Sequence, residues 1–304
     1  MSSNTDVTVS PLVYRNRRER LVRESMLWGS LDRLIRNPQG LLGLFILGLL
    51  LFAAIFAPLI TWHDPNLQDG AARFLSPSWE HPFGTDELRR DLYSRTVYGL
   101  RVSLLISLVA VAIGSTIGII AGFLSGYFGG WVDTLAMRVV DALLAFPGLL
   151  AALAIVTILG PGIRNVGIAI AFFSVPSFAR LSRAQMLAER NRDYVRAAES
   201  LGAGAFRVVF GHIARNAIAP LLTQVALFMA AAVILSASLS FLGLGEKPPD
   251  PSLGGLVNSS KSNLQKAWWY AVFPGATLAA LLLSLNLLAD AINEAINPFA
   301  RRRA

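Results

Sequence analysis

The sequence lacks cysteine and has few histidines and few charged residues, and each shortage excludes a class of function. Without cysteine there is no disulfide framework, thiolate zinc site or cysteine nucleophile. His63, His81 and His212 are scattered along the chain, which predicts no metal site and no metal-dependent catalysis. Only 15% of the 304 residues are charged, against about 25% in soluble globular proteins. An ordinary soluble enzyme is therefore not favoured.

Hydrophobic residues are abundant instead, at 54% of the chain, with a mean hydropathy of +0.53. A helix needs about 20 apolar residues to cross a bilayer. The sequence predicts six such spans, at residues 40–62, 102–128, 142–163, 165–186, 216–245 and 267–289. The fourth is the shortest uncharged run, so it is either a re-entrant helix or a span in which Arg180 and Arg183 reach the interface.

The distribution of Lys and Arg predicts the orientation in the membrane. With both termini inside, the inner segments carry twice as many Lys and Arg as the outer ones, as the positive-inside rule requires. Residues 1–39 then form a cytoplasmic segment, in which 26–35 either lies in the membrane interface or is a solvated helix or tail. The first apolar run is too long for a cleaved signal peptide. The net charge of +8 does not indicate nucleic-acid binding, because the basic residues lie in separate blocks.

A long polar segment, residues 187–215, separates the fourth and fifth predicted spans. We expect Asp193 to cap a helix that runs through Leu201, and Gly202 to end it. A second helix is predicted from Ala203. Its apolar stripe consists of Phe206, Val209, Phe210 and Ile213. This stripe packs either on a partner protein, or on the protein's own spans or lipid.

The same segment resembles the cytoplasmic loop of permease subunits in binding-protein-dependent ABC importers. That loop has the pattern EAA, three residues, G, about nine residues and I-x-LP. The matching positions are Arg196, Ala197, Ala198, Gly202, Ile218 and Pro220, with Arg196 in place of the usual Glu. Tyr194, Ala203 and His212 fit the wider pattern.

Further motifs resemble the C-type subunit of the dipeptide, oligopeptide and nickel permease group. They are GTDELRRDLYSR at 84–95, GYFGGWVD at 126–133, MRVVDALLAFP at 137–147, SLSFLGLGEKPPDPSLG at 238–254 and LNLLADAINEAINP at 285–298. Arg89 replaces a usual Gly in the first motif. Ala289, Ala291, Asn293 and Asn297 depart from the usual residues of the last.

The resemblance implies an all-α integral membrane protein of the type I ABC importer kind, with six transmembrane helices, N-in and C-in, in the bacterial inner membrane. Its implied partners are a homologous second permease, two cytoplasmic ATPases, a periplasmic or lipid-anchored binding protein and membrane lipid. The chain itself would bind no cofactor and catalyse nothing, because ATP and Mg²⁺ belong to the ATPases. Peptide is the expected substrate, with nickel or glutathione as alternatives.

On this resemblance the 196–213 loop helix couples the permease to an ATPase. The expected coupling residues are Tyr194, Arg196, Ala197, Ala198, Glu199, Gly202, Ala203, Arg207, His212, Ile213 and Pro220. The residues alone leave open a stand-alone secondary carrier or channel, or a membrane scaffold that transports nothing. The absence of a membrane chain of carboxylates or histidines counts against a proton-coupled carrier.

Two further groups of polar residues have alternative readings. Arg138 with Asp141, and Asn286 with Asp290, lie one helical turn apart and form either structural pairs or gates. The segment before the second span has two possible roles. It is either a scaffold, in which Thr85 or Asp86 caps a helix, or the surface that docks the binding protein. The residues concerned are Gly84, Thr85, Asp86, Arg90 and Asp91.

Overall fold

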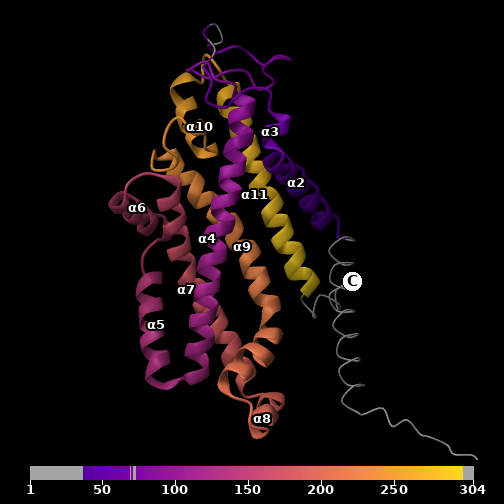
Figure 1. Ribbon diagram of the computed structural model, residues 1–304, viewed down its shortest axis with the longest axis vertical. Helices are drawn as coiled ribbons and strands as arrows, with labels where there is room; N and C mark the ends of the chain where they lie inside the picture. Colours follow the sequence, from indigo (N-terminus) through magenta and orange to yellow (C-terminus); the bar gives the residue numbers. More distant parts are fainter. Residues whose placement is uncertain (1–36, 69, 71–72, 297–304) are drawn as a thin grey trace, which may run out of the picture.

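The computed structural model describes residues 37–68, 70 and 73–296, and the secondary-structure elements of this part of the chain are helices joined by loops (Figure 1). Its helices are α2 Pro38–Ile55, α3 Ala57–Ile60, α4 Leu92–Phe128, α5 Gly130–Leu144, α6 Gly148–Leu159, α7 Ile163–Arg190, α8 Asp193–Ser200, η1 Arg207–Ile213, α9 Ala214–Phe241, α10 Leu253–Ser260, η2 Lys261–Asn263 and α11 Trp269–Ile296. The segment 26–35, for which an interfacial helix is one of the predicted alternatives, lies outside the described residues, as do Arg301, Arg302 and Arg303 near the end of the sequence.

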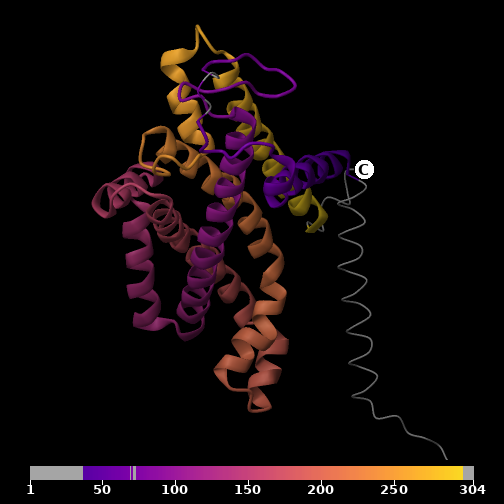
Figure 2. The ribbon, with the colours of Figure 1, turned by 45° about the horizontal axis from the view of Figure 1, so that its top comes forward.

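Five of these helical segments are long and apolar enough to cross a membrane. They are Pro38–Ile55, Leu92–Phe128, Ile163–Arg190, Arg207–Phe241 and Trp269–Ala295. A sixth crossing exists only if α5 and α6 together form one span, and these two helices meet at 89° (Figure 2). The sequence predicts a continuous helix over 142–163, whereas the helix breaks between Leu144 and Gly148. Pro147 explains the break, because it lacks an N–H and disfavours helical geometry in the residue before it.

The weakest predicted span, at 165–186, is a continuous helix of 28 residues in the structure. It packs along α4 through small residues at every fourth position. Gly114, Gly118, Gly122 and Gly126 of α4 are all buried, and a Cβ at any of them would collide with α7. In lipid no hydrophobic effect drives helices together, so they associate through close packing of small residues such as these glycines.

Charged residues join α7 to α5. Arg183 binds Asp133, and Arg180 binds Asp141, each with an N–O distance of 2.5 Å. Asp141 is therefore paired across helices and not with Arg138, the neighbour that the spacing predicted. Asn286 also stays within its own helix, where its amide donates to the Leu282 carbonyl at 3.0 Å. Asp141 thus finds its partner on a neighbouring helix, whereas Asn286 bonds the backbone one turn earlier in its own helix.

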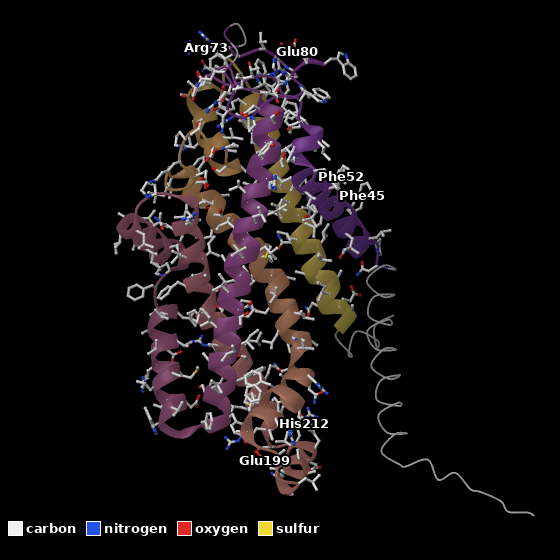
Figure 3. The ribbon with its side chains drawn as sticks, viewed as in Figure 1. Phe45, Phe52, Arg73, Glu80, Glu199 and His212 are labelled. Carbon is white, nitrogen blue, oxygen red and sulfur yellow. The ribbon has the colours of Figure 1, made fainter. Side chains whose placement is uncertain are left out.

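The outer face of α2 is apolar and exposed. Phe45 and Phe52 point away from the bundle, and Leu41 and Leu49 are exposed on the same helix (Figure 3). A soluble protein would bury such a face, whereas lipid covers it at no cost. The exposed apolar helices agree with a protein that crosses a membrane several times.

Candidate functional site

The segment between α7 and α9 forms a compact projection at one end of the molecule, with α8 at its tip (Figure 1). The backbone after α8 makes a Schellman turn: Gly202 N–H donates to the Glu199 carbonyl at 2.9 Å, and Ala203 N–H to the Ala198 carbonyl at 3.0 Å. Gly202 has a φ of +81°, which glycine tolerates without strain. The expected helix stop at Gly202 is thus explained by its backbone, while Asp193 is the first helical residue and not the cap.

The projection is anchored by a hydrophobic cluster at the ends of α4 and α7. Val208, Val209 and Ile213 of η1 are buried against Phe123 and Met186. The predicted apolar stripe is consequently divided. Val209 and Ile213 pack on the protein's own helices, Phe210 is half-buried, and Phe206 points outward with 77% of its surface exposed.

Tyrosine side chains hold α8 against the bundle. Tyr127 of α4 donates its hydroxyl to Glu199 at 3.2 Å, and Tyr194 donates to Glu189 at 2.7 Å. Burial and the hydrogen bond to Glu189 raise the pKa of Tyr194, so its hydroxyl stays protonated and remains a donor. Tyr127 belongs to the GYFGGWVD motif at 126–133, but nothing in the sequence indicated its contact with α8, because the two segments are far apart in the chain.

The surface left at the tip is mixed in character. Leu201 is 89% exposed, and Phe206, five residues later, is 77% exposed. Arg196, Glu199, Arg207 and His212 are exposed around them; Glu199 and His212 are visible at the lower end of Figure 3. Two bare apolar side chains ringed by charges are typical of a protein contact surface.

Pro220 lies farther from this surface than its motif position implies. The helix already begins at Arg207, as a π-helical stretch that continues into α9, so Pro220 is inside a long helix and not near its start. Proline in a helix interior removes one backbone hydrogen bond. Of the expected coupling residues, Tyr194 to Ile213 are brought together at the projection, and Pro220 is not part of its tip.

At the opposite end, the segment between α3 and α4 is organised by Asp86. Its carboxylate accepts hydrogen bonds from the backbone of Leu88 and Arg90 and from the Arg90 guanidinium, at 2.7 to 2.9 Å. The cap of α4 is Asp91, which accepts from Ser94 N–H at 2.7 Å, and not Thr85 or Asp86. Thr85, Asp86, Arg90 and Asp91 are all buried, so in this structure they shape the segment from inside.

Two further residues of the 84–95 motif, Arg89 and Arg95, have structural roles here. Arg95 is buried, and its guanidinium donates to the carbonyls of Pro65 at 2.7 Å and Pro249 at 3.2 Å, which ties two loops at this end of the molecule together. Arg89 has a φ of +65°, a left-handed geometry in which glycine is the usual residue. The geometry accounts for the glycine expected at this position of the motif.

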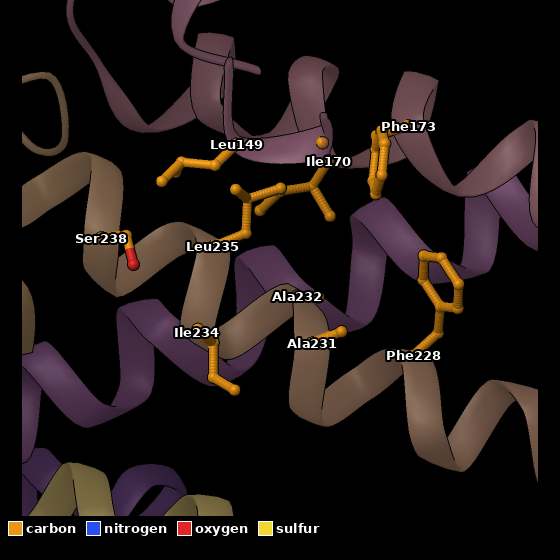
Figure 4. Close-up of a pocket in the computed structure, with 10 residues that line it drawn as sticks. Leu149, Ile170, Phe173, Phe228, Ala231, Ala232, Ile234, Leu235 and Ser238 are labelled. Atoms are coloured by element: carbon orange, nitrogen blue, oxygen red, sulfur yellow. The ribbon is translucent and has the colours of Figure 1, made fainter. Parts of the chain in front are cut away.

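An apolar pocket lies among α6, α7 and α9 (Figure 4). Leu149 comes from α6, Ile170 and Phe173 from α7, and Phe228 and Leu235 from α9. Ser238 supplies the one side-chain hydroxyl among its lining residues, and none of them is charged. Without a charged residue, this lining cannot bind a ligand through an ion pair.

Comparison with known proteins shows that this chain is similar to transport permeases. Residues 114–302 match the family described as "Binding-protein-dependent transport system inner membrane component", and residues 25–77 match the N-terminal transmembrane domain of oligopeptide transport permease C. The di/tripeptide transport system permease protein DppC of Pseudomonas aeruginosa is 41% identical over 88% of this chain and 90% of its own length. The dipeptide permease DppC of Escherichia coli K12 is 44% identical over 86% of this chain and 90% of its own.

A solved structure of the MetNI methionine ABC transporter in inward-facing conformations shares the fold, with a TM-score of 0.56 at 17% identity. The match covers 67% of this chain and 96% of that one. The family match, the relatives and the apolar helices identify a transport component rather than an enzyme. The chain belongs to the family of multi-pass inner-membrane permease components of binding-protein-dependent transport systems.

Proposed function

We propose that this chain forms half of the translocation pathway of an ATP-driven importer for dipeptides and tripeptides. The names of its P. aeruginosa and E. coli relatives support this substrate class. A homologous permease would supply the other half, two cytoplasmic ATPases the driving force, and a binding protein the substrate. The chain would bind no cofactor, and ATP and Mg²⁺ would reside in the ATPases.

The observation that carries the proposal is the projection between α7 and α9. Leu201 is exposed on a turn that is fixed by its backbone bonds, and Phe206 is exposed in the helical turn that follows. The buried Val209 and Ile213 anchor this segment to the bundle. ATP can drive transport only if a change in the ATPase shifts the permease between two arrangements, and a firmly anchored contact is needed to transmit that shift. The neutral pocket among α6, α7 and α9 is compatible with peptides of varied side chains.

We further propose six crossings, with α5 and α6 forming one bent span, and both termini in the cytoplasm. The Lys and Arg bias supports this orientation, since Arg190, Arg192 and Arg196 cluster at the end of the molecule that carries α8. The segment between α3 and α4 then faces the binding protein. Its exposed Trp79, rather than the buried Asp86, is the kind of residue that could contact it.

The natural absence of cysteine provides the test. A single cysteine at Leu201→Cys is cross-linked in native membranes and its adduct identified by mass spectrometry, with Trp79→Cys, also highly exposed, as the matched control at the other end. We expect Leu201→Cys alone to capture a nucleotide-binding subunit. Recovery of no ATPase by either variant, while the purified chain still moves peptide across vesicles, would establish a stand-alone carrier instead.

A further inference from the structure

Two of the three histidines, distant in the sequence, lie side by side in the structure. The ring centroids of His63 and His81 are 4.8 Å apart, and the side chain of Glu80 lies close to both. One potential ligand atom from each of the three residues lies within 4.8 Å of the others. Figure 3 shows Glu80 at the end of the molecule opposite Glu199 and His212. The histidines are scattered along the sequence, but the fold brings this pair together.

His81 is held in the orientation that metal ligation requires. Its Nδ1 lies 2.9 Å from Asp91 Oδ1, and both side chains are buried. Since an ionised carboxylate only accepts hydrogen bonds, Nδ1 carries the proton and the lone pair is left on Nε2. Metal-bound histidines commonly donate their second N–H to a carboxylate in this way. The other oxygen of Asp91 caps α4, so the imidazole is fixed to the start of a long helix.

His63 contributes a second, independent observation. Its Nδ1 is enclosed and has no hydrogen-bond partner in the described part of the chain. Enclosed polar atoms are nearly always paired, and an unpaired one indicates a missing ion, water or ligand. The turn that carries Glu80 and His81 is itself fixed, because Ser78 N–H donates to the His81 carbonyl at 2.9 Å and Ser78 Oγ accepts from His81 N–H at 3.1 Å.

The geometry points to a divalent transition-metal site formed by His63, Glu80 and His81, with Asp91 orienting His81. Two imidazoles and one carboxylate are ligands that suit Zn²⁺, and the sequence has no thiolate to compete for it. Bonds of about 2.1 Å place tetrahedral ligand atoms roughly 3.4 Å apart, so the side chains need to close by about 1.4 Å at most. The exposed Glu80 is free to rotate.

Such an ion would tie the two ends of the segment between α3 and α4 together. His63 follows α3 by three residues, and His81 is linked through Asp91 to the first turn of α4. The ion would therefore stabilise this segment. Its binding is independent of which end of the molecule faces the cytoplasm.

The test is Zn²⁺ binding to the full chain, purified without a histidine tag, stripped with chelator and reconstituted in lipid nanodiscs. We expect calorimetry to give one Zn²⁺ per chain. His63→Gln and Glu80→Gln should each weaken binding at least about tenfold, as loss of metal-site groups does. His212→Gln is the matched control, because His212 lies at the other end of the molecule. Its affinity should equal that of the wild type.

Co²⁺ provides a second readout, since its ligand-field absorption changes when an imidazole is lost. The wild-type and His212→Gln spectra should agree, and the His63→Gln spectrum should differ. Replacing the buried His81 could disturb folding as well as metal binding. The experiment therefore relies on variants of His63 and Glu80, which are less buried. The proposal is overturned if the wild type binds no stoichiometric Zn²⁺, or if His63→Gln and Glu80→Gln bind as well as the wild type. An equal loss in His212→Gln overturns it too.

Discussion

The hydroxyl of Ser182 in α7 lies 3.3 Å from the carbonyl oxygen of Gly118 in α4, so the two helices are close enough for a side chain of one to bond the backbone of the other. Ser182 is fully buried at this contact and also donates to the Phe178 carbonyl of its own helix at 2.7 Å. The approach depends on glycine, because a Cβ at Gly118 or Gly122 of α4 would occupy the space of α7.

The first prediction concerns this contact. Gly122→Ala should destabilise the protein by about 1 to 3 kcal/mol, because the new methyl group falls on Ser182 Oγ and on the Ala179 carbonyl. Gly48→Ala in α2 is the control, since nothing lies within 4 Å of its Cβ position. Thermal unfolding in one detergent measures both. Equal melting temperatures for the two variants would show that the glycines are not needed for packing.

The second prediction concerns Asp86. Asp86→Asn removes the carboxylate that binds Arg90 and lies 3.5 Å from the Nε of Arg95, and all three groups are buried. Leaving buried guanidinium groups without their counter-ion should cost roughly 3 to 5 kcal/mol. Asp64→Asn, an exposed residue whose oxygen accepts from Asn66 N–H, should cost little. Differential scanning fluorimetry compares them, and a small effect of Asp86→Asn would mean that the loop does not depend on this pair.

The third prediction separates the two sides of the projection. Phe206→Ala should lower substrate-stimulated ATP hydrolysis in the assembled importer and leave the melting temperature of the purified chain unchanged, because Phe206 is exposed. Val209→Ala should lower the free energy of unfolding by about 2 kcal/mol, and with it the melting temperature, because Val209 is buried. If Phe206→Ala hydrolyses ATP at the wild-type rate, the tip is not the contact surface.

The fourth prediction is a pH dependence. Burial and the nearby Asp250 raise the pKa of Glu246, whose Oε2 is enclosed without a hydrogen-bond partner in the described chain. A carboxyl with a raised folded-state pKa favours folding while protonated and loses that contribution as the pH rises through the folded pKa. Glu246→Gln should therefore melt higher than the wild type at neutral pH.

The advantage of Glu246→Gln should shrink as the pH falls toward the ordinary glutamate pKa of 4.5, where the wild-type carboxyl also becomes neutral. Melting curves at neutral and acidic pH, recorded with chelator present, measure this difference. A constant difference at every pH would show that the effect comes from shape and not from charge.

The sequence by itself determined that the chain is helical and membrane-embedded, because long uncharged runs have no other stable arrangement in lipid. It also determined the helix stop at Gly202, since that depends on local backbone geometry. The motifs in their order indicated the permease family, which the comparisons confirm.

Only the tertiary structure decided which residues meet. Asp141 binds Arg180 rather than Arg138, Asp91 caps α4 in place of Thr85 or Asp86, and His63 lies against His81. It also divided the apolar stripe, burying Val209 and exposing Phe206. The physical reason is that spacing along one helix fixes which side chains share a face, but the contact of that face depends on helices that are distant in sequence.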